Sequence, residues 1–251
     1  MMNNTTIEKL HILKLPGMAE EFSRQLMTPA TNELAFEHRV RNMVDHETTL
    51  RDSKRLQALL KKASLPQSAC VQDIDYRTQR GLDKAEVQSL ITLDWIRNRN
   101  NLVITGPTGT GKSWLACALA NQACRDGLSC YFVRVPILIE NLTAARATGG
   151  LYSRLQQLKR YDLLILDDWG IEPISKRVQN DLLELIDSRA GACSFLITSQ
   201  MPMNMWHDLF DNKTVADALM DRIVHSSYQI ELSGESLRKM QEVGRKGLRQ
   251  K

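Results

Sequence analysis

One short loop constrains the fold of this chain more than any other feature. It fits the pattern G-x-x-x-x-G-K-[ST], follows the apolar segment 102–105 and leads into a run of helix-forming residues. Between a strand and a helix, the backbone N–H groups of such a loop wrap a phosphate, and the helix dipole favours the same anion. We therefore expect a nucleotide-phosphate site. Its residues are Gly106, Pro107, Thr108, Gly109, Thr110, Gly111, Lys112, Ser113 and Trp114.

Lys112 and Ser113 have distinct expected roles within this loop. The Lys112 ammonium group can bridge the β- and γ-phosphates of a nucleotide, and the Ser113 hydroxyl can hold Mg²⁺. The sequence thus predicts ATP and Mg²⁺ as cofactors. A chance glycine-rich turn is the alternative, and the flanking strand and helix argue against it.

Short β-branched segments alternate with helical ones in the rest of the chain. Strands are expected at 102–105, 131–135, 163–166, 195–198 and 228–231, with a helix from Asp83 to about Arg97 and room for two helices in 136–161. This alternation predicts an α/β fold with a mostly parallel five-stranded sheet flanked by helices. Ligands of such sheets bind beyond the carboxyl ends of the strands.

The first 65 residues contain no strand pattern. A capping box at Thr5–Glu8 opens an expected helix, Pro16-Gly17 interrupts it, and a long polar stretch with a thin apolar stripe ends near Pro66. We expect a small all-α domain at 1–66, a linker at 67–82 and an ATPase domain at 83–251. The helical domain either docks a partner or packs as a bundle on the main domain.

Composition limits the class of protein. With 43% hydrophobic and 25% charged residues, the chain is an ordinary globular one, and no apolar run approaches the roughly 18 residues of a membrane span. The five cysteines form no C-x-x-C pair, which argues against a zinc site or a disulfide framework and favours a cytoplasmic protein. The net charge is +4, and basic residues gather in 238–251.

Two aspartates follow the third expected strand. Asp167, which we expect beside the strand that precedes the loop, can complete the Mg²⁺ shell with Ser113. Asp168 can orient an attacking water. The pair could also simply begin a turn. The fourth strand ends in Thr198-Ser199-Gln200, from which Ser199 is our candidate for bonding the water or the γ-phosphate; strand-end caps are the alternative.

Together these motifs resemble those of AAA+ ATPases, and more closely the IstB-type helper ATPases of insertion sequences, relatives of the DnaC helicase loaders. The resemblance runs from Leu10 onward and is carried by GPTGTGKSWLA, DLLILDDWG, FLITSQMP, ADALMDRIVH and IELSGESLRK. It implies a P-loop strand at the centre of the sheet and a short helical lid. It also implies that Arg222 is an arginine finger acting on a neighbouring subunit and that Arg238 is a sensor acting in its own subunit.

Two departures from the general AAA+ pattern affect the expected rate of ATP hydrolysis. Asp168 replaces the usual glutamate, and the Thr198-Ser199-Gln200 run replaces the usual asparagine of the fourth strand. Both favour slow, switch-like hydrolysis.

The segment 136–161 carries the candidate DNA contacts. Initiator-type AAA+ proteins, which the chain resembles, use this region to grip DNA, and backbone contacts of this kind tolerate any sequence. A solvent-facing amphipathic hairpin is the alternative. The candidates are Arg146, Arg154, Lys159 and Arg160.

Three functional hypotheses follow. The first is an ATP-dependent ATPase that forms head-to-tail homo-oligomers, binds double-stranded DNA and assists transposition by recruiting or stimulating a transposase. The second is a DnaC-like helicase loader. The third is a monomeric small-molecule P-loop kinase, which would leave Arg222 and the basic tail without a role. The sequences of the motifs LDDWG, TSQMP and GESLRK favour the first hypothesis.

Overall fold

The computed structural model describes residues 2–76, 80–172, 174–224 and 227–237, and the chain divides into two units, 1–58 and 59–251. The division falls within helix α3 (Phe36–Ala63), whereas the sequence placed a domain boundary after Pro66. Each unit is described by itself.

The first unit is helical. It contains α1 (Met2–Ile12), α2 (Pro16–Met27), the 3-10 helix η1 (Pro29–Glu33) and the first part of α3. The expected capping box at Thr5 is not used, because α1 already begins at Met2. Pro16 instead begins α2, since a proline at the first helical position loses no hydrogen bond.

The buried carboxylate of Glu47, on α3, caps α2. Its Oε2 accepts the N–H groups of Gly17 at 2.7 Å and Met18 at 3.2 Å, and its Oε1 accepts from Arg51 at 2.6 Å. Burial alone would raise the pKa of Glu47, but the bonds from Arg51, Met18 and Gly17 outweigh it, and the pKa is lowered. Gly17 is required here because a Cβ would lie 2.7 Å from the Cα of Glu47.

The second unit contains a five-stranded sheet, and every pair of neighbouring strands is parallel, as expected. Its strands are β1 (Asn101–Thr105), β2 (Cys130–Arg134), β3 (Leu163–Trp169), β4 (Ser194–Ser199) and β5 (Ser227–Glu231). The expected α/β class is therefore confirmed.

The order of the strands corrects two expectations. The order is β2-β3-β4-β1-β5, so β4 is the central strand and β1, which precedes the glycine-rich loop, lies between β4 and β5. Asp167 is consequently on a strand that does not neighbour β1, because β4 lies between them. The connection from β1 to β2 skips two strand positions, which β3 and β4 then fill, and hydrophobic patterning does not encode such a choice.

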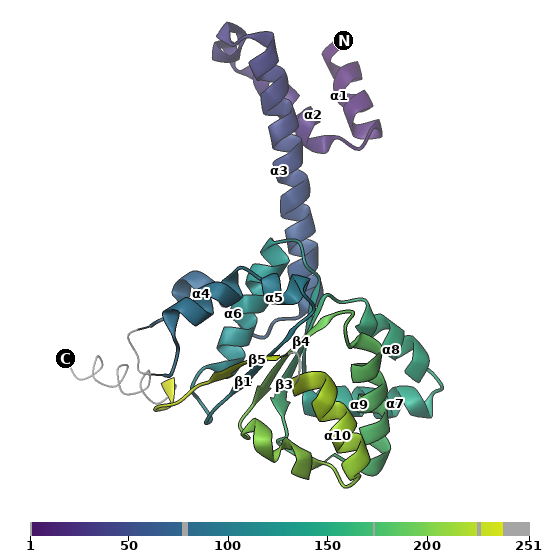
Figure 1. Ribbon diagram of the computed structural model, residues 1–251. Helices are drawn as coiled ribbons and strands as arrows, with labels where there is room; N and C mark the ends of the chain where they lie inside the picture. Colours follow the sequence, from purple (N-terminus) through teal and green to yellow (C-terminus); the bar gives the residue numbers. More distant parts are fainter. Residues whose placement is uncertain (1, 77–79, 173, 225–226, 238–251) are drawn as a thin grey trace, which may run out of the picture. The chain divides into compact units, whose positions relative to one another are not determined.

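Helices cover both faces of the sheet (Figure 1). One face carries α4 (Lys84–Ile91), α5 (Asp94–Arg97) and α6 (Lys112–Arg125); the other carries α7 (Val135–Ala147), α8 (Leu151–Lys159), α9 (Lys176–Arg189) and α10 (Lys213–Val224). Two 3-10 helices, η2 (Val71–Asp73) and η3 (Met203–Leu209), complete the described elements. The two helices expected in 136–161 are confirmed as α7 and α8.

The helix expected from Asp83 to Arg97 is divided. Asp83 caps α4 as expected, accepting the N–H of Glu86 at 2.9 Å. Leu93 then adopts a left-handed φ of 63° and separates α4 from α5. The sequence predicted one continuous helix because the apolar pattern runs across this break: Leu90 of α4 and Trp95 of α5 are both buried.

The segment 67–82, expected as a linker, packs into the second unit. Ala69, Val71 and Ile74 are buried, and η2 contacts α6. Burial of these three apolar side chains explains why this part of the segment packs on the domain rather than acting as a free linker. The expected helical lid lies outside the described residues. Among the described helices, none has the length and apolar character needed to cross a membrane.

Candidate nucleotide site

The glycine-rich loop joins the carboxyl end of β1 to the first residue of α6. Gly106 has a φ of +138°, and a Cβ there would overlap the carbonyl oxygen of Leu232. Gly111 has a φ of +96° immediately before α6. Only glycine adopts both conformations without strain, so the backbone can present its N–H groups to an anion at the helix N-terminus.

Lys112 is folded inside this loop. Its Nζ donates to the carbonyl oxygens of Gly106 at 2.7 Å and Pro107 at 2.8 Å, and the residue is only 8% exposed. Thr108 donates to Oε1 of Gln200 at 2.6 Å, which ties the loop to the end of β4. The cation therefore lies where a phosphate bound by the loop would need it.

Ser113 and Asp167 are in direct contact. The Ser113 hydroxyl donates to Oδ1 of Asp167 at 2.7 Å, and Thr198 donates to the same oxygen at 2.5 Å. Asp167 is 5% exposed. Hydroxyl and carboxylate oxygens are ligands that Mg²⁺ accepts, and the ion usually keeps several waters besides. The donor set at this point therefore fits Mg²⁺.

A β-bulge sets the positions of the two aspartates. Leu166 pairs with Ile197 and Trp169 with Ser199, so Asp167 and Asp168 together face the single residue Thr198. Asp168 adopts a left-handed φ of 64°, and its N–H donates to the Thr198 hydroxyl at 3.2 Å. The strand was expected to end at Leu166, but it continues through the bulge to Trp169.

Thr198, rather than Ser199, is the hydroxyl that touches the acidic pair. Ser199 is fully buried; its Oγ donates to the Trp169 carbonyl at 2.7 Å and accepts the Met201 N–H at 3.0 Å. The donor and one acceptor position of the Ser199 hydroxyl thus hold the end of β4, which is the strand-end alternative considered above.

Arg134 was not foreseen as a site residue. It ends β2, and its Nε donates to Oδ2 of Asp168 at 2.7 Å. The hydrogen bond and charge of Asp168 raise the pKa of Arg134. Its place near the end of the predicted strand 131–135 was the available signal, since the carboxyl ends of parallel strands share one edge.

A thiol does not add a nucleophile to this site. Cys117 follows Ser113 by one turn of α6, and burial raises the pKa of its thiol to about 11. The thiolate is the reactive form, so Cys117 behaves near neutral pH as a buried apolar residue.

Of the two candidate arginines in the last third of the chain, only Arg222 is among the described residues. Arg222 lies on α10 as expected, donates to Oδ1 of Asp187 at 2.5 Å and to the Ala218 carbonyl at 2.9 Å, and its side chain is 33% exposed. Arg238 lies outside the described residues. Trp114 is half-buried in the first turn of α6.

Comparison with known proteins decides the family. The sequence profile of the IstB-like ATP-binding proteins matches residues 8–244. The chain belongs to this family. An insertion-sequence ATP-binding protein of Sinorhizobium fredii is 45% identical over 96% of this chain and 98% of its own length. The ATP-binding protein of insertion sequence IS1162 from Pseudomonas fluorescens is 47% identical over 80% of this chain and 88% of its own.

Solved structures agree with the AAA+ fold of this IstB-family protein. DnaI is similar with a TM-score of 0.56 and 23% identity, covering 65% of this chain and 90% of that one. DnaA of Aquifex aeolicus bound to AMPPCP is similar with a TM-score of 0.54 and 16% identity, covering 70% of this chain and 53% of that one. At these identities the likeness concerns the fold alone.

The candidate DNA contacts of this IstB-family protein separate into two groups. Arg146 pairs through Nε and Nη2 with Asp181, whose side chain is 1% exposed. Arg154 lies over the ring of Tyr131, 5.7 Å from its centroid, and donates to its hydroxyl at 3.2 Å. Lys159 and Arg160 are exposed at the end of α8. The first two thus have structural partners, and the last two face solvent.

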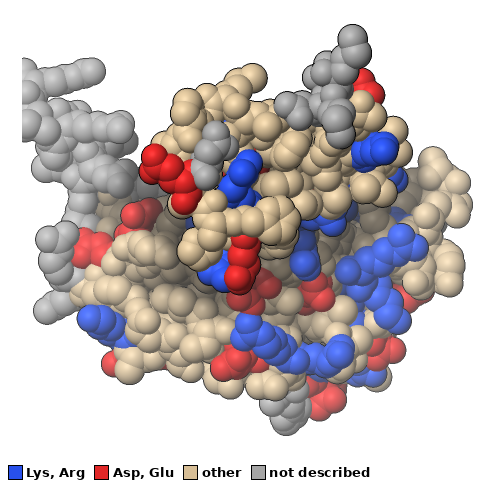
Figure 2. Space-filling model, turned by 90° about the horizontal axis from the view of Figure 1, so that it is seen from above, with Lys and Arg blue, Asp and Glu red and all other residues tan. Residues whose placement is uncertain are grey.

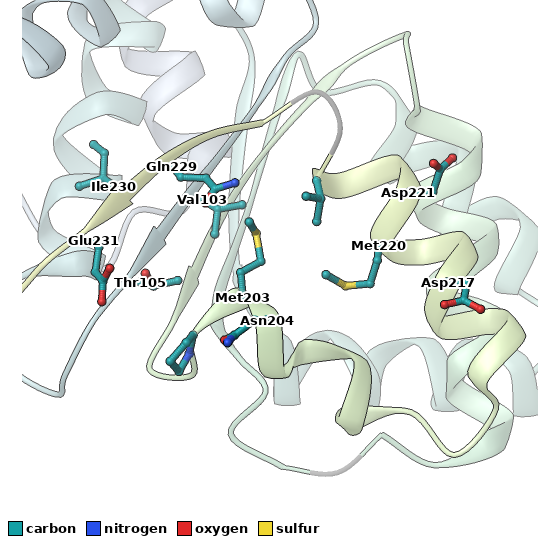
Figure 3. Close-up of a pocket in the computed structure, with 12 residues that line it drawn as sticks. Val103, Thr105, Met203, Asn204, Asp217, Met220, Asp221, Gln229, Ile230 and Glu231 are labelled. Carbon is teal, nitrogen blue, oxygen red and sulfur yellow. The ribbon is translucent and has the colours of Figure 1, made fainter.

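One cleft of the IstB-family protein has a lining that does not include the glycine-rich loop. It has a volume of about 850 Å³ and lies between β1 and β5 on one side and η3 and α10 on the other. Figure 3 shows Val103, Met203 and Met220 directed toward this space. The nucleotide assignment therefore rests on loop geometry and on the Ser113–Asp167 contact, not on cavity size.

Proposed function

We propose that this protein is an ATP-dependent, Mg²⁺-requiring AAA+ ATPase that assembles head to tail, binds double-stranded DNA and assists insertion-sequence transposition by recruiting or stimulating a transposase. The observation that carries the proposal is the Ser113–Asp167 contact beneath the glycine-rich loop. Relatives that match 96% and 80% of this chain are insertion-sequence ATP-binding proteins, which supports transposition over helicase loading. The likeness to DnaI concerns the fold and favours neither partner.

Each residue of the site has a separate role in ATP binding or hydrolysis. The loop N–H groups and Lys112 bind the β- and γ-phosphates, and Ser113 and Asp167 would hold Mg²⁺, which supplies charge neutralisation at the transferred phosphate. Asp168 orients the attacking water through the carboxylate that Arg134 holds by one oxygen. Arg134 fixes this carboxylate at the sheet edge, and the shorter reach of aspartate compared with glutamate favours slow turnover.

Replacing Asp168 by asparagine should slow hydrolysis by about 10²-fold or more while leaving ATP binding intact, because a positioned base contributes about 10²–10⁴. The Thr198–Asp167 bond does not involve this side chain, so the Mg²⁺ ligand stays in place. Single-turnover hydrolysis and equilibrium ATP binding are the measurements. Asp126→Asn is the control, because Asp126 is also paired with an arginine, Arg97, but away from the loop. Equal turnover in Asp168→Asn and wild type would make Asp168 a bystander.

DNA binding should depend on ATP, tolerate any sequence and weaken steeply with salt. On the face in Figure 2, acidic and basic side chains of the described residues are interspersed, so DNA bound on that face would rely on local cations rather than on a field of one sign. Lys159 and Arg160 are the residues to replace, because removing Arg146 would leave the buried Asp181 unpaired and destabilise the fold.

The Lys159→Ala, Arg160→Ala double variant should flatten the plot of log K against log salt by about one unit per lost phosphate contact. Arg125→Ala, on α6 across the sheet, is the matched control and should leave the slope unchanged. An unchanged slope in the double variant would move the DNA contact away from α8. In a second arm, strand transfer by the transposase of the same insertion sequence should rise only when this protein and ATP are both present; no rise would contradict the transposition role.

A further inference from the structure

A buried guanidinium lies beside the glycine-rich loop and has no role in the function proposed above. Arg80 is 6% exposed. Its Nη1 lies 3.0 Å from the position that a Cβ on Gly111 would take, and it donates to the Thr110 carbonyl at 3.5 Å. Its Nη2 donates to the Asp75 carbonyl at 2.8 Å. A fixed positive charge is therefore buried against the segment that cradles phosphate.

Among the described residues, no close carboxylate pairs with the charge of Arg80. Its Nε is buried without a hydrogen-bond partner in the same part of the chain. Burial lowers the pKa of Arg80, and the nearby charge of Asp75 only partly opposes this. A buried cation without a close anion is costly, and Arg189 is buried in the same way far from the loop. What distinguishes Arg80 is its position against Thr110 and Gly111, in the segment that cradles phosphate.

The backbone holds Arg80 in place from the side of β5. Its carbonyl accepts the Ser233 N–H at 2.9 Å, and the next residue, Gly81, has a φ of 74° with no room for a side chain, since a Cβ would lie 2.7 Å from the Glu231 carbonyl oxygen. The segment after β5 also meets the loop directly, because the Leu237 N–H donates to the Gly109 carbonyl at 3.0 Å. Arg80 is thus positioned before any ligand arrives.

We infer that Arg80 is a further nucleotide-binding residue, which meets the phosphates of a bound nucleoside di- or triphosphate with its buried charge. The inference rests on the proposed ATP site and adds a second cation to Lys112. Arg80 reaches the loop from the segment before β1, whereas Lys112 belongs to the loop itself. Pre-positioned charge costs little entropy on binding, so it contributes to affinity rather than to folding.

Three substitutions separate charge from shape. Arg80→Lys keeps the charge, Arg80→Gln keeps a donor for the Thr110 carbonyl without the charge, and Arg80→Met keeps only the apolar stem. Affinity for ATP and for inorganic tripolyphosphate is measured by calorimetry, and the melting temperature is measured without nucleotide. Arg189→Met is the control. Arg189 is fully buried near the amino-terminal end of β4, away from the loop, where it donates to the Leu158 and Ser194 carbonyls.

We expect Arg80→Gln and Arg80→Met to lose about 10- to 100-fold in affinity for both ligands, the range for a charge-assisted hydrogen bond, and Arg80→Lys to retain most of it. Arg189→Met should lower the melting temperature and leave affinity unchanged. Wild-type affinity in Arg80→Gln and Arg80→Met would overturn the inference. So would a loss in Arg80→Met alone that follows its melting temperature, because that is a structural role. Loss of ATP with unchanged tripolyphosphate binding would place Arg80 at the base or ribose instead.

Failure of this inference is distinguishable from failure of the proposed function. If wild type binds no ATP, the function itself is wrong. If wild type binds ATP, Lys112→Ala does not, and Arg80→Gln binds like wild type, only the role of Arg80 is wrong.

Discussion

Replacing Lys112 by alanine is expected to abolish ATP binding and to reduce turnover by at least about 10²–10³-fold, the loss seen when one preorganised charge-stabilising donor is removed. The Lys112 ammonium group is held by the Gly106 and Pro107 carbonyls inside the loop. In the nucleotide complex it exchanges these neutral acceptors for charged phosphate oxygens, and charge-assisted bonds are about twice as strong. Alanine supplies no donor and leaves the phosphate charge uncompensated.

The fold should survive this substitution. Lys112 is the first residue of α6, and alanine is the best helix former. The melting temperature of Lys112→Ala without nucleotide should therefore remain near that of wild type. At a hundredfold excess of ATP over Kd, wild type gains about 2.7 kcal/mol of stability by mass action, and the variant should gain none.

Lys84→Ala is the matched control, because Lys84 is also a first helical residue, of α4, but is exposed. It should bind and hydrolyse ATP like wild type. Nucleotide-dependent thermal shifts of the two variants, measured side by side with turnover, test the assignment. A normal shift in Lys112→Ala would remove the nucleotide site from this loop.

Local sequence was enough to predict the loop and its neighbours. Residues 102–113 contain the strand, the glycines that tolerate positive φ and the start of the helix within one continuous segment, so no distant contact has to be known. The five parallel strands followed from their β-branched runs for the same reason. The meeting of Ser113 and Asp167 could also be expected, because both stand at the carboxyl edge of one parallel sheet.

Features that depend on distant pairing could not be predicted in this way. The position of β4 between β3 and β1 is a choice of crossover, and the bulge that turns Thr198 toward both aspartates depends on the register of β3 against β4. The patterns of Thr198 and Ser199 are equivalent in sequence, and only this register separates them. Arg80 was hidden because a polar segment before a domain reads as a linker unless its burial is known.

Arg222 is expected to act in subunit assembly, and its ion pair with Asp187 allows a test of this expectation. The Arg222–Asp187 ion pair is partly exposed, with side chains 33% and 57% accessible, and such pairs contribute about 0–1 kcal/mol. An arginine that meets transition-state charge contributes about 10³–10⁵ in rate, or roughly 4 kcal/mol and more. Asp168 in place of glutamate reduces this figure. Breaking the ion pair with Asp187 still costs less free energy than Arg222 gains by stabilising the transition state at the nucleotide of a neighbouring subunit.

Arg222→Ala should therefore retain ATP binding but lose hydrolysis and ATP-dependent oligomers, because a head-to-tail contact completes each site with a residue of the next subunit. Asp187→Ala is the matched control: it breaks the same ion pair, leaves Arg222 in place and should keep hydrolysis. If Asp187→Ala is as inactive as Arg222→Ala, the ion pair itself, and not a reach into the neighbour, explains the loss.

Mixing two inactive variants separates action in trans from action in cis. Arg222→Ala offers a sound loop and Lys112→Ala offers a sound arginine, so mixed assemblies contain some sites with both, and ATPase activity at fixed total protein with DNA present should exceed that of either variant alone. Two variants that act within one subunit cannot rescue each other, since every chain then lacks one part of its own site. No gain on mixing, together with normal oligomers of Arg222→Ala, would leave Arg222 as a residue that only holds α10 to α9 through Asp187.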